Sequence, residues 1–358
     1  RPSTMPKPTT AASGAAALPM HVVLVTMDSH LASAAARANR TLAKAMPGLR
    51  LSVHAAAEWG DDDAALARCK ADIATGDIVI VTMLFMEDHF LPVLPALRAR
   101  RDQCDAMVCA MSAGEVMKLT RMGKFDMGSP ATGAMAFLKR LRGKTSHKSD
   151  EQSVKSSAGA QQMKMLRRLP KILRFIPGTA QDVRAYFLTL QYWLAGSEDN
   201  VAHLVHFLVD RYAAGPRQGL RGLVKTHAPV EYPELGVYHP QIRNRLSDDL
   251  SDMPRVATSG KRGTVGLLLL RSYLLAGNTD HYDGVITALE ARGLRVVPAF
   301  ATGLDARPAV EAFFLKDGRP TIDALVSLTG FSLVGGPAYN DSRAAEETLA
   351  QLDVPYLA

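Results

Sequence analysis

The chain has 358 residues, 47% of them hydrophobic, which suits two or three domains with real cores and excludes a disordered or fibrous protein. The formal net charge of +7 is concentrated in one segment. Between Lys139 and Arg174, eleven Lys and Arg residues against Asp150 and Glu151 give +9, which leaves −2 for the remainder. No aromatic residues alternate with these bases to stack nucleobases, so we expect no nucleic-acid partner; the segment is a solvated linker and helix face, or a docking surface for an acidic partner subunit.

The cysteines and the amino-terminal residues indicate a cellular compartment. Cys69, Cys104 and Cys109 form no C-x-x-C pair, which is typical of a reducing environment, and we expect no disulfide and no zinc site. No apolar run is long enough to cross a bilayer, so we expect no transmembrane segment. Residues 1–19 are rich in Pro, Ala and Thr and lack the apolar segment of a signal peptide, which predicts a flexible tail. We therefore expect a cytoplasmic protein.

Residues 20–140 predict an amino-terminal α/β domain. Apolar strands are expected at 21–25, 51–54, 78–85 and 106–111, with helices between them and a further helix from about Ala113. The triplet Asp61–Asp63 opens one helix, where capping explains the carboxylates better than a metal does. The loop Met86–His89 follows a strand and combines two carboxylates with an imidazole, so it is either a binding loop or an ordinary surface loop.

Residues 141–162 predict a mobile basic linker, and residues 163–258 a helical connector that ends in an extended strap. His203 and His206 lie three apart on one helical face; apolar neighbours favour packed or interfacial histidines over a shared ligand or metal, and we assign no metal site. In the strap Tyr232–Pro240, two prolines and a glycine stiffen the backbone and display Tyr238 and His239. Such a strip serves equally well as a binding surface or as an interdomain strap.

One segment imitates a nucleotide-binding loop. Gly219 to Thr226 has the first glycine, the lysine and the threonine of a P-loop in register. Val224 stands where the motif requires glycine, and no strand precedes the segment. We interpret it as a chance match and expect no ATP hydrolysis by this chain alone.

Residues 259–358 predict the start of a second α/β domain. The apolar run Val265–Leu270 is followed by a helix to Arg292, a strand 294–297 that stops at Pro298, a helix around 310–315 and a strand 322–328. Continuously apolar strands between helices indicate a parallel sheet. The predicted fold class is therefore α/β, with two parallel-sheet α/β units joined by a mainly helical segment. Loops 271–280, 301–305 and 329–336 should converge at the carboxyl edge of the second sheet, where ligands bind in such folds.

Several motifs now combine into a resemblance. They are the strip Pro233-x-x-Gly236-x-Tyr238-His239-Pro240, the segment Arg271-Ser272-x-Leu274-x-x-Gly277-Asn278 after an apolar strand, and the closing Thr329-Gly330-Phe331. Together they resemble the family of large chelatase subunits, which includes the magnesium chelatase H subunit and the large subunit of cobaltochelatase. Details such as His281-Tyr282-Asp283-Gly284 and Gly303-Leu304-Asp305 lean toward the magnesium branch.

The resemblance implies insertion of Mg2+ into protoporphyrin IX in chlorophyll or bacteriochlorophyll biosynthesis, with ATP hydrolysed on two partner subunits. For such a reaction, the best-placed candidates on this chain for proton or metal handling are Asp280 and His281, and those for substrate binding are Arg271, Tyr238, His239, Gly330 and Phe331. Arg271 would pair a porphyrin propionate, although it could instead bind strand ends, as Asp280 could simply cap a helix. Family members are several times longer, and the apolar run at 353–358 suggests a truncated domain, so we expect an inactive amino-terminal fragment.

Two alternatives remain from the sequence. The cobalt branch would act on hydrogenobyrinic acid diamide, and a two-lobed module that binds a small ligand would carry out no chemistry. Binding of protoporphyrin separates the second from the chelatases, and competition between the two macrocycles separates the two branches.

Overall fold

A computed structural model describes residues 14–129, 168, 170–171, 178–255, 262–336 and 339–358. Most of the predicted tail and all of the predicted linker 141–162 lie outside these residues. The chain divides into two compact units, Arg1–Val230 (unit 1) and Glu231–Ala358 (unit 2). Within the described ranges, no helix combines the length and the apolar character needed to cross a membrane.

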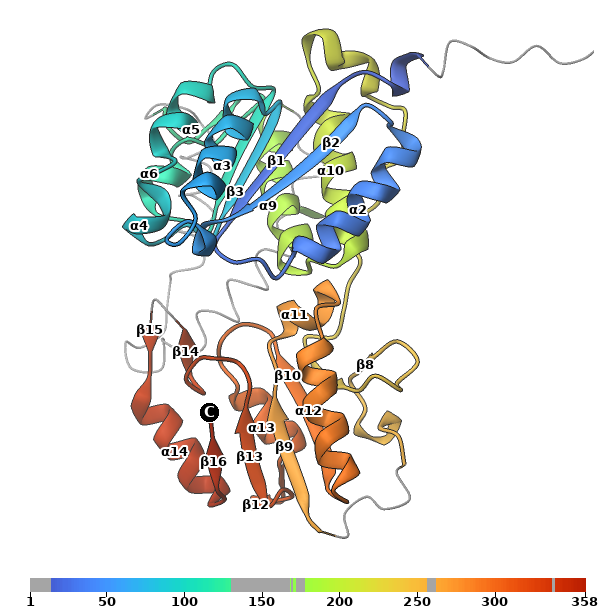
Figure 1. Cartoon of the computed structure of the whole chain (residues 1–358), viewed down its shortest axis with the longest axis vertical. Coiled ribbons are helices and arrows are strands. Elements are labelled where there is room, and N and C mark those ends of the chain that lie inside the picture. Colours follow the sequence, from blue (N-terminus) through green and yellow to red (C-terminus); the bar gives the residue numbers. More distant parts are fainter. Residues whose placement is uncertain (1–13, 130–167, 169, 172–177, 256–261, 337–338) are drawn as a thin grey trace, which may run out of the picture. The chain divides into compact units, whose positions relative to one another are not determined.

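Unit 1 is a six-stranded sheet with helices on both faces, as Figure 1 shows. Its elements in chain order are β1 (Met20–Thr26), α2 (Ala32–Ala45), β2 (Leu49–Ala55), the 3-10 helix η1 (Ala56–Glu58), α3 (Asp63–Thr75), β3 (Ile78–Thr82), α4 (Glu87–Phe90), α5 (Leu94–Arg100), β4 (Ala106–Ala110), α6 (Gly114–Met117), β5 (Arg121–Met122), β6 (Phe125–Asp126), α9 (Thr179–Leu194), α10 (Glu198–Tyr212) and the 3-10 helix η2 (Gly215–Leu220). The strand order is β2-β1-β3-β4-β5-β6, in which the first four strands are parallel.

The helices of unit 1 form where the sequence predicts caps and apolar faces. The Asp62 carboxylate accepts the backbone N–H of Ala65, so the acidic triplet caps α3 as predicted. The Ser197 hydroxyl caps α10 in the same way at Asn200. α3 and α5 bury one face of the sheet, while α2 packs against α10, which packs against α9. The predicted loop Met86–His89 is wrong at its centre, because Glu87–Phe90 form the short helix α4.

Unit 2 repeats the arrangement around a second six-stranded sheet. Its elements are β7 (Leu235–Tyr238), β8 (Leu246–Ser247), the 3-10 helix η3 (Leu250–Asp252), β9 (Thr264–Leu268), α11 (Arg271–Ala276), α12 (Asp280–Ala291), β10 (Arg295–Ala301), α13 (Arg307–Phe313), β11 (Leu315–Lys316), β12 (Arg319–Pro320), β13 (Ala324–Ser327), β14 (Gly335–Gly336), β15 (Tyr339–Asn340), α14 (Ser342–Leu352) and β16 (Tyr356–Leu357). The order is β16-β13-β9-β10-β7-β8; the first four strands are parallel, and β7 and β8 are antiparallel. The predicted α/β class with two mostly parallel sheets is confirmed.

Two sequence-based boundaries in unit 2 differ from the structure. β10 continues past Pro298 to Ala301, because its pairing with β7 begins at Ala299 and the N–H that proline lacks is not needed there. The segment predicted as a connector with a strap, 163–258, is divided between the units: α9 and α10 pack in unit 1, whereas the strap supplies β7 and β8 to the second sheet.

The core of unit 2 lies on both faces of β9. A side chain at Gly266 would crowd this core, because a Cβ atom at this position would stand 2.9 Å from the Phe314 ring and from the Ile322 side chain. On that face, α13 and α14 pack against Leu268, Val297 and Leu325. On the other face, α12 packs through Tyr282 and Ile286 against Val265, Leu267 and Leu269. Parallel strands of this kind bring their carboxyl ends to one edge, where the helices begin.

Candidate functional site

A pocket lies at the carboxyl edge of the second sheet. It encloses about 380 Å³, part of it open to solvent. The fourteen residues that line it come from the ends of three neighbouring strands and the loops that follow: Leu268–Leu270 after β9, Phe300–Ala306 without Thr302 after β10, and Ser327, Thr329 and Phe331–Leu333 after β13. The chain order reverses between β9 and β13, so this is the topological switch point where ligands bind in open α/β sheets.

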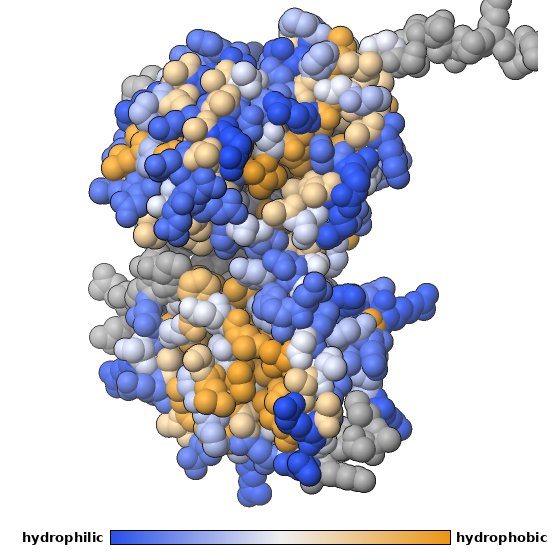
Figure 2. Space-filling model, viewed as in Figure 1, coloured by the Kyte–Doolittle hydropathy of each residue, from blue (hydrophilic) through white to orange (hydrophobic). Residues whose placement is uncertain are grey.

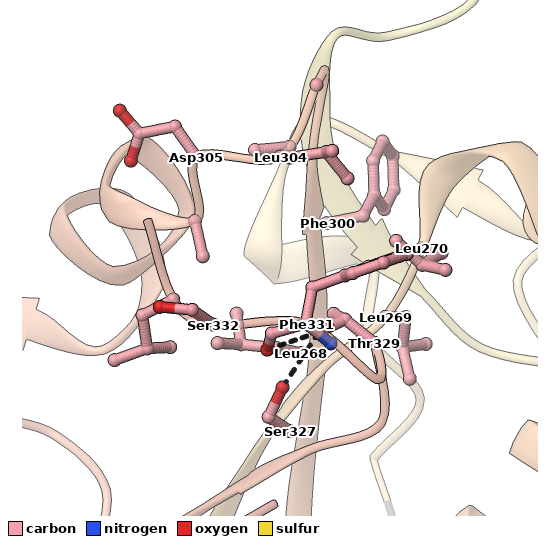
Figure 3. Close-up of a pocket in the computed structure, with 14 residues that line it drawn as sticks. Leu268, Leu269, Leu270, Phe300, Leu304, Asp305, Ser327, Thr329, Phe331 and Ser332 are labelled. Carbon is pink, nitrogen blue, oxygen red and sulfur yellow. Dashed lines mark hydrogen bonds between the residues drawn. The ribbon is translucent and has the colours of Figure 1, made fainter. Parts of the chain in front are cut away.

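The loop after β13 is held by its own hydroxyl groups. Thr329 Oγ1 accepts the Phe331 N–H at 3.1 Å and donates to the Phe331 carbonyl oxygen at 3.2 Å, while Ser327 Oγ lies 3.1 Å from Thr329 Oγ1. Gly330 has φ of +73°, a left-handed conformation that other residues adopt only at a cost. The tight turn carries Phe331 to the pocket, as Figure 3 shows.

The loop after β10 is fastened to the segment that follows Phe331. Asp305 forms an isolated antiparallel bridge with Val334, and the Ala306 N–H donates to the Leu333 carbonyl oxygen at 2.8 Å. The Asp305 carboxylate also receives the Arg307 guanidinium, with Nη2 at 2.7 Å and Nε at 3.0 Å. These hydrogen bonds to a carboxylate hold the pKa of Arg307 above its usual value. Loops 301–305 and 329–336, two of the three loops predicted to meet at this edge, are therefore in direct contact.

Of the seven predicted site residues, Phe331 lines the pocket and Gly330 makes the turn beside it. Arg271 follows the lining residue Leu270, but its guanidinium donates to the carbonyl oxygens of Pro233 at 2.8 Å and Tyr232 at 3.2 Å. This geometry matches the alternative in which Arg271 binds the backbone instead of a porphyrin propionate.

The prediction that Tyr238 and His239 are exposed on the strap is wrong. Tyr238 ends β7 with no exposed surface, and His239 is 2% exposed, because the strap pairs with β10 and is covered by α12. Tyr238 Oη donates to Asp283 at 2.5 Å, and burial together with this carboxylate raises the Tyr238 pKa to about 12. His239 Nδ1 accepts the Gln241 N–H, so Nε2 carries the proton toward Glu290 at 2.8 Å. Both side chains are occupied inside unit 2.

Asp280 and His281 lie in the first turn of α12, exposed and outside the pocket lining. The His281 ring lies 4.0 Å from the Tyr282 ring and 5.7 Å from the Tyr273 ring, centre to centre. These two aromatic neighbours restrict where the imidazole can point.

Three residues that were not among the seven predicted site residues, Phe300, Leu304 and Leu333, give the pocket much of its apolar wall. Their signal was present: each follows or ends a strand whose carboxyl end faces this edge. The prediction that β10 stops at Pro298 removed Phe300 from consideration, and polar residues were favoured over apolar ones.

Other candidates from the sequence do not assemble into a site. His203 and His206 both lie on α10, and the His203 ring is 5.0 Å from that of His227. Burial and the neighbouring imidazoles lower the pKa of His206. Throughout the described part of the chain, no cluster of three or more His, Cys, Asp or Glu residues is arranged to hold a metal ion.

Comparison with known proteins matches two family models. Residues 21–187 match a domain of unknown function (DUF3479), and residues 190–358 match CobN/Magnesium Chelatase. The pocket falls entirely within the second match. The catalytic subunit of cobaltochelatase from Mycobacterium tuberculosis aligns in structure with 86% of this chain and 18% of its own, at 17% identity and a TM-score of 0.37.

Curated relatives agree along nearly the whole chain. The magnesium-chelatase H subunit of Cereibacter sphaeroides is 52% identical over 97% of this chain, and that of Rhodobacter capsulatus is 48% identical over 96%. The chloroplastic magnesium-chelatase subunit ChlH of Oryza sativa subsp. indica is 33% identical over 94%. The chain spans 28% of the length of the two bacterial relatives and 24% of that of the rice relative. The region of the pocket therefore matches the CobN/magnesium chelatase family model, and similarity to magnesium-chelatase H subunits extends along nearly the whole chain.

Proposed function

We propose that this chain is part of the porphyrin-binding subunit of a magnesium chelatase, which inserts Mg2+ into protoporphyrin IX in the biosynthesis of chlorophyll or bacteriochlorophyll. Both Mg2+ and the porphyrin are substrates. ATP is hydrolysed on two partner subunits, in the cytoplasm. Support comes from the relatives named as magnesium-chelatase H subunits and from a sequence without an intact P-loop.

The observation that carries the proposal is the apolar pocket at the switch point of unit 2. Flat apolar ligands bind in clefts lined mainly by hydrophobic and aromatic side chains with a few placed polar groups. Phe300, Phe331, Leu270 and Leu304 provide such walls, and the hydroxyl groups of Ser327 and Thr329 hold the loop that carries Phe331. We assign substrate contact to Phe331, positioned by Gly330.

Metal insertion requires the loss of two pyrrole protons and the removal of tightly held water from Mg2+. Asp280 and His281 are the proposed proton acceptors, since a carboxylate and an imidazole lie exposed at consecutive positions at the start of α12. Arg271 is assigned a positioning role, because it fixes the Tyr232–Pro233 backbone beside the loop after β9. Tyr238 and His239 position α12 through Asp283 and Glu290.

The binding test uses the whole subunit and quenching of its fluorescence by protoporphyrin IX. Phe331→Ala should raise Kd about tenfold or more, since a contacting aromatic side chain contributes about 1–3 kcal/mol. Phe85→Ala is the matched control, because Phe85 is 47% exposed, belongs to unit 1 and is not among the residues that line the pocket. Equal affinity in the two variants would remove the pocket from the porphyrin site. If hydrogenobyrinic acid diamide displaces protoporphyrin with higher affinity, the cobalt branch is the correct assignment.

The catalytic test measures Mg2+ insertion by the assembled enzyme with ATP. His281→Ala should slow insertion about a hundredfold, the usual contribution of a general base, with porphyrin affinity unchanged. Ser272→Ala is a suitable control, since Ser272 is exposed on the neighbouring helix α11. An unchanged rate in His281→Ala would reject the assignment of that residue alone and leave the binding site intact.

A further inference from the structure

The lining of the pocket in unit 2 is mostly apolar and contains no basic side chain. None of its fourteen lining residues is Lys, Arg or His, and one, Asp305, is a carboxylate. The walls are formed by Leu268–Leu270, Phe300, Leu304 and Phe331, which Figure 3 labels, together with Leu333. An anionic group inside this pocket would meet no lining cation and would lie near a carboxylate.

The cations closest in sequence to the lining residues are held elsewhere. Arg307 donates from its backbone N–H and from two guanidinium nitrogens to Asp305. Arg271 donates to two backbone carbonyl oxygens of the segment Tyr232–Pro233. A carboxylate that enters the pocket would lose its water without gaining a charge partner, and this desolvation costs several kcal/mol.

The hydroxyl groups of the pocket are also engaged. Thr329 Oγ1 accepts a hydrogen bond from the Phe331 N–H and donates one to the Phe331 carbonyl oxygen, and Ser327 Oγ is hydrogen-bonded to Thr329 Oγ1. Ser332 Oγ accepts the Val334 N–H at 3.4 Å. These groups shape the loop after β13, so little hydrogen-bonding capacity is left for a carboxylate.

Protoporphyrin IX has one apolar half and one half that carries negative charge. One half of its rim carries vinyl and methyl groups, and the opposite half carries two propionates. We propose that the pocket receives the vinyl-bearing edge of the porphyrin, inserted against Phe331 and Leu304, and that the propionates stay outside. The proposal rests on the function proposed above and adds the orientation of the ring. The empty space of about 380 Å³ includes open solvent, so at most one edge of the macrocycle could enter and not the whole ring.

The orientation predicts how a pocket variant responds to changes in the porphyrin. Three probes are titrated into the whole subunit: protoporphyrin IX, deuteroporphyrin IX, in which hydrogen replaces both vinyl groups, and protoporphyrin IX dimethyl ester, in which both propionates are neutral. Phe331→Ala should weaken protoporphyrin and the ester by the same factor. It should weaken deuteroporphyrin at least about threefold less, because the vinyl carbons that Phe331 would cover are absent.

Leu304→Ala is a second variant that keeps the test informative if Phe331→Ala disturbs the turn. Leu304 lines the pocket and is 40% exposed in a loop, so its truncation leaves the core of unit 2 unchanged. The same pattern across the probes is expected, with a smaller factor. Phe85→Ala should change none of the three affinities.

Two outcomes overturn the orientation. The first is an equal loss for all three probes in both variants. The second is a loss that shrinks when the propionates are esterified, which would place the propionates at the pocket. If the unaltered subunit binds none of the probes, the proposed function itself fails, and that result is distinct from either.

Discussion

The four parallel strands have the same order in the two α/β units, but the sheets differ in how they are covered. In unit 1, the order β2-β1-β3-β4 is flanked by α3 and α5 on one face, while α2, α10 and α9 pack together on the other. In unit 2, the order β10-β9-β13-β16 is the same, with α13 and α14 on one face and α12 on the other. No described helix of unit 2 takes the place that α9 and α10 fill beside α2.

The difference appears in one row of side chains across the second sheet. Leu267 of β9 lies beside Val326 of β13, which lies beside Leu357 of β16. Leu267 is fully buried under α12, Val326 is half-buried and Leu357 is 62% exposed. Figure 2 shows hydrophobic residues gathered on the face of unit 2 where Figure 1 draws these strands. Strand order alone therefore does not determine burial; the number of covering helices does.

The carboxyl edges differ as well. In unit 1, the loop after β2 is the short helix η1, which is bonded to the end of β1 through Ala57 N–H and the Met27 carbonyl oxygen, 2.8 Å apart, and Trp59 beyond it is buried with Leu84 and Phe90. In unit 2, the corresponding loop after β10 reaches across to Val334 and leaves the pocket beneath it. Trp59 is buried at the carboxyl edge of unit 1, whereas Phe300 and Phe331 at the edge of unit 2 line a pocket.

The largest expected effect concerns ion pairs in the two units. Asp105 of unit 1 is 4% exposed and receives two guanidinium nitrogens of Arg217 at 2.7 and 2.8 Å. Asp105→Ala should lower the free energy of unfolding of unit 1 by about 3–5 kcal/mol, because it removes a buried carboxylate that accepts three hydrogen bonds, two from Arg217 and one from the Ala214 N–H. Arg217 would keep only Asp77, at 3.4 Å. Asp305→Ala should cost unit 2 at most about 1 kcal/mol, since Asp305 is 36% exposed and Arg307 30%.

Urea titration can measure the two units separately. Both tryptophans of the chain, Trp59 and Trp193, lie in unit 1, so tryptophan fluorescence follows unit 1, and far-UV circular dichroism adds the transition of unit 2. Equal losses in the two variants would show that burial does not distinguish these ion pairs.

The next largest effect on stability is expected in the row Leu267, Val326 and Leu357 across the second sheet. Leu267→Ala should destabilise unit 2 by about 2–5 kcal/mol, as expected for a fully buried leucine. Leu357→Ala should change its stability by less than about 0.5 kcal/mol in the same urea titration. A large loss in Leu357→Ala would mean that the exposed end of the row is covered in solution, for example by a second copy of the chain.

The smallest effect is a pH dependence confined to unit 1. Burial and two neighbouring histidines lower the pKa of His206 in the folded chain from 6.5, so the unfolded chain binds a proton first as the pH falls. Stability should therefore be fully present above pH 6.5 and decline below it. His206→Gln should make the decline shallower in fluorescence-monitored urea titrations at pH 7.5, 6.5 and 5.5. A decline as steep in the variant would assign the dependence to other groups, such as His21, whose pKa is also lowered by burial.

Much of the fold could be predicted because its signals are local. Continuously apolar strands such as Val265–Leu270 and the cap at Asp62 identify themselves within a few residues. The carboxyl edge of the second sheet followed from the order of strands and helices, and the pocket lies there. The motif residue Phe331 reached the pocket because a glycine turn directly after a strand keeps its neighbour at that edge.

The misses came from contacts distant in sequence. The stiffness of the strap correctly indicated extended backbone, but its pairing with β10 joins residues more than sixty positions apart, and this pairing buries Tyr238. Arg271 finds its acceptors 38 and 39 residues earlier in the chain. No local pattern distinguishes a guanidinium that binds backbone from one that binds a ligand.

The loops after β9 and β10 both hold the segment 232–234 at the start of unit 2. Arg271 holds Tyr232 and Pro233, and Thr302 donates from its N–H and its hydroxyl to the Glu234 carbonyl oxygen at 2.7 and 3.0 Å. Leu270 and Ala301, the residues just before these two, both line the pocket. Cleavage by a glutamate-specific protease after the exposed Glu234 should therefore slow when a bound ligand stiffens these loops. The rate of proteolysis in this segment can then report occupancy without any optical signal from the ligand.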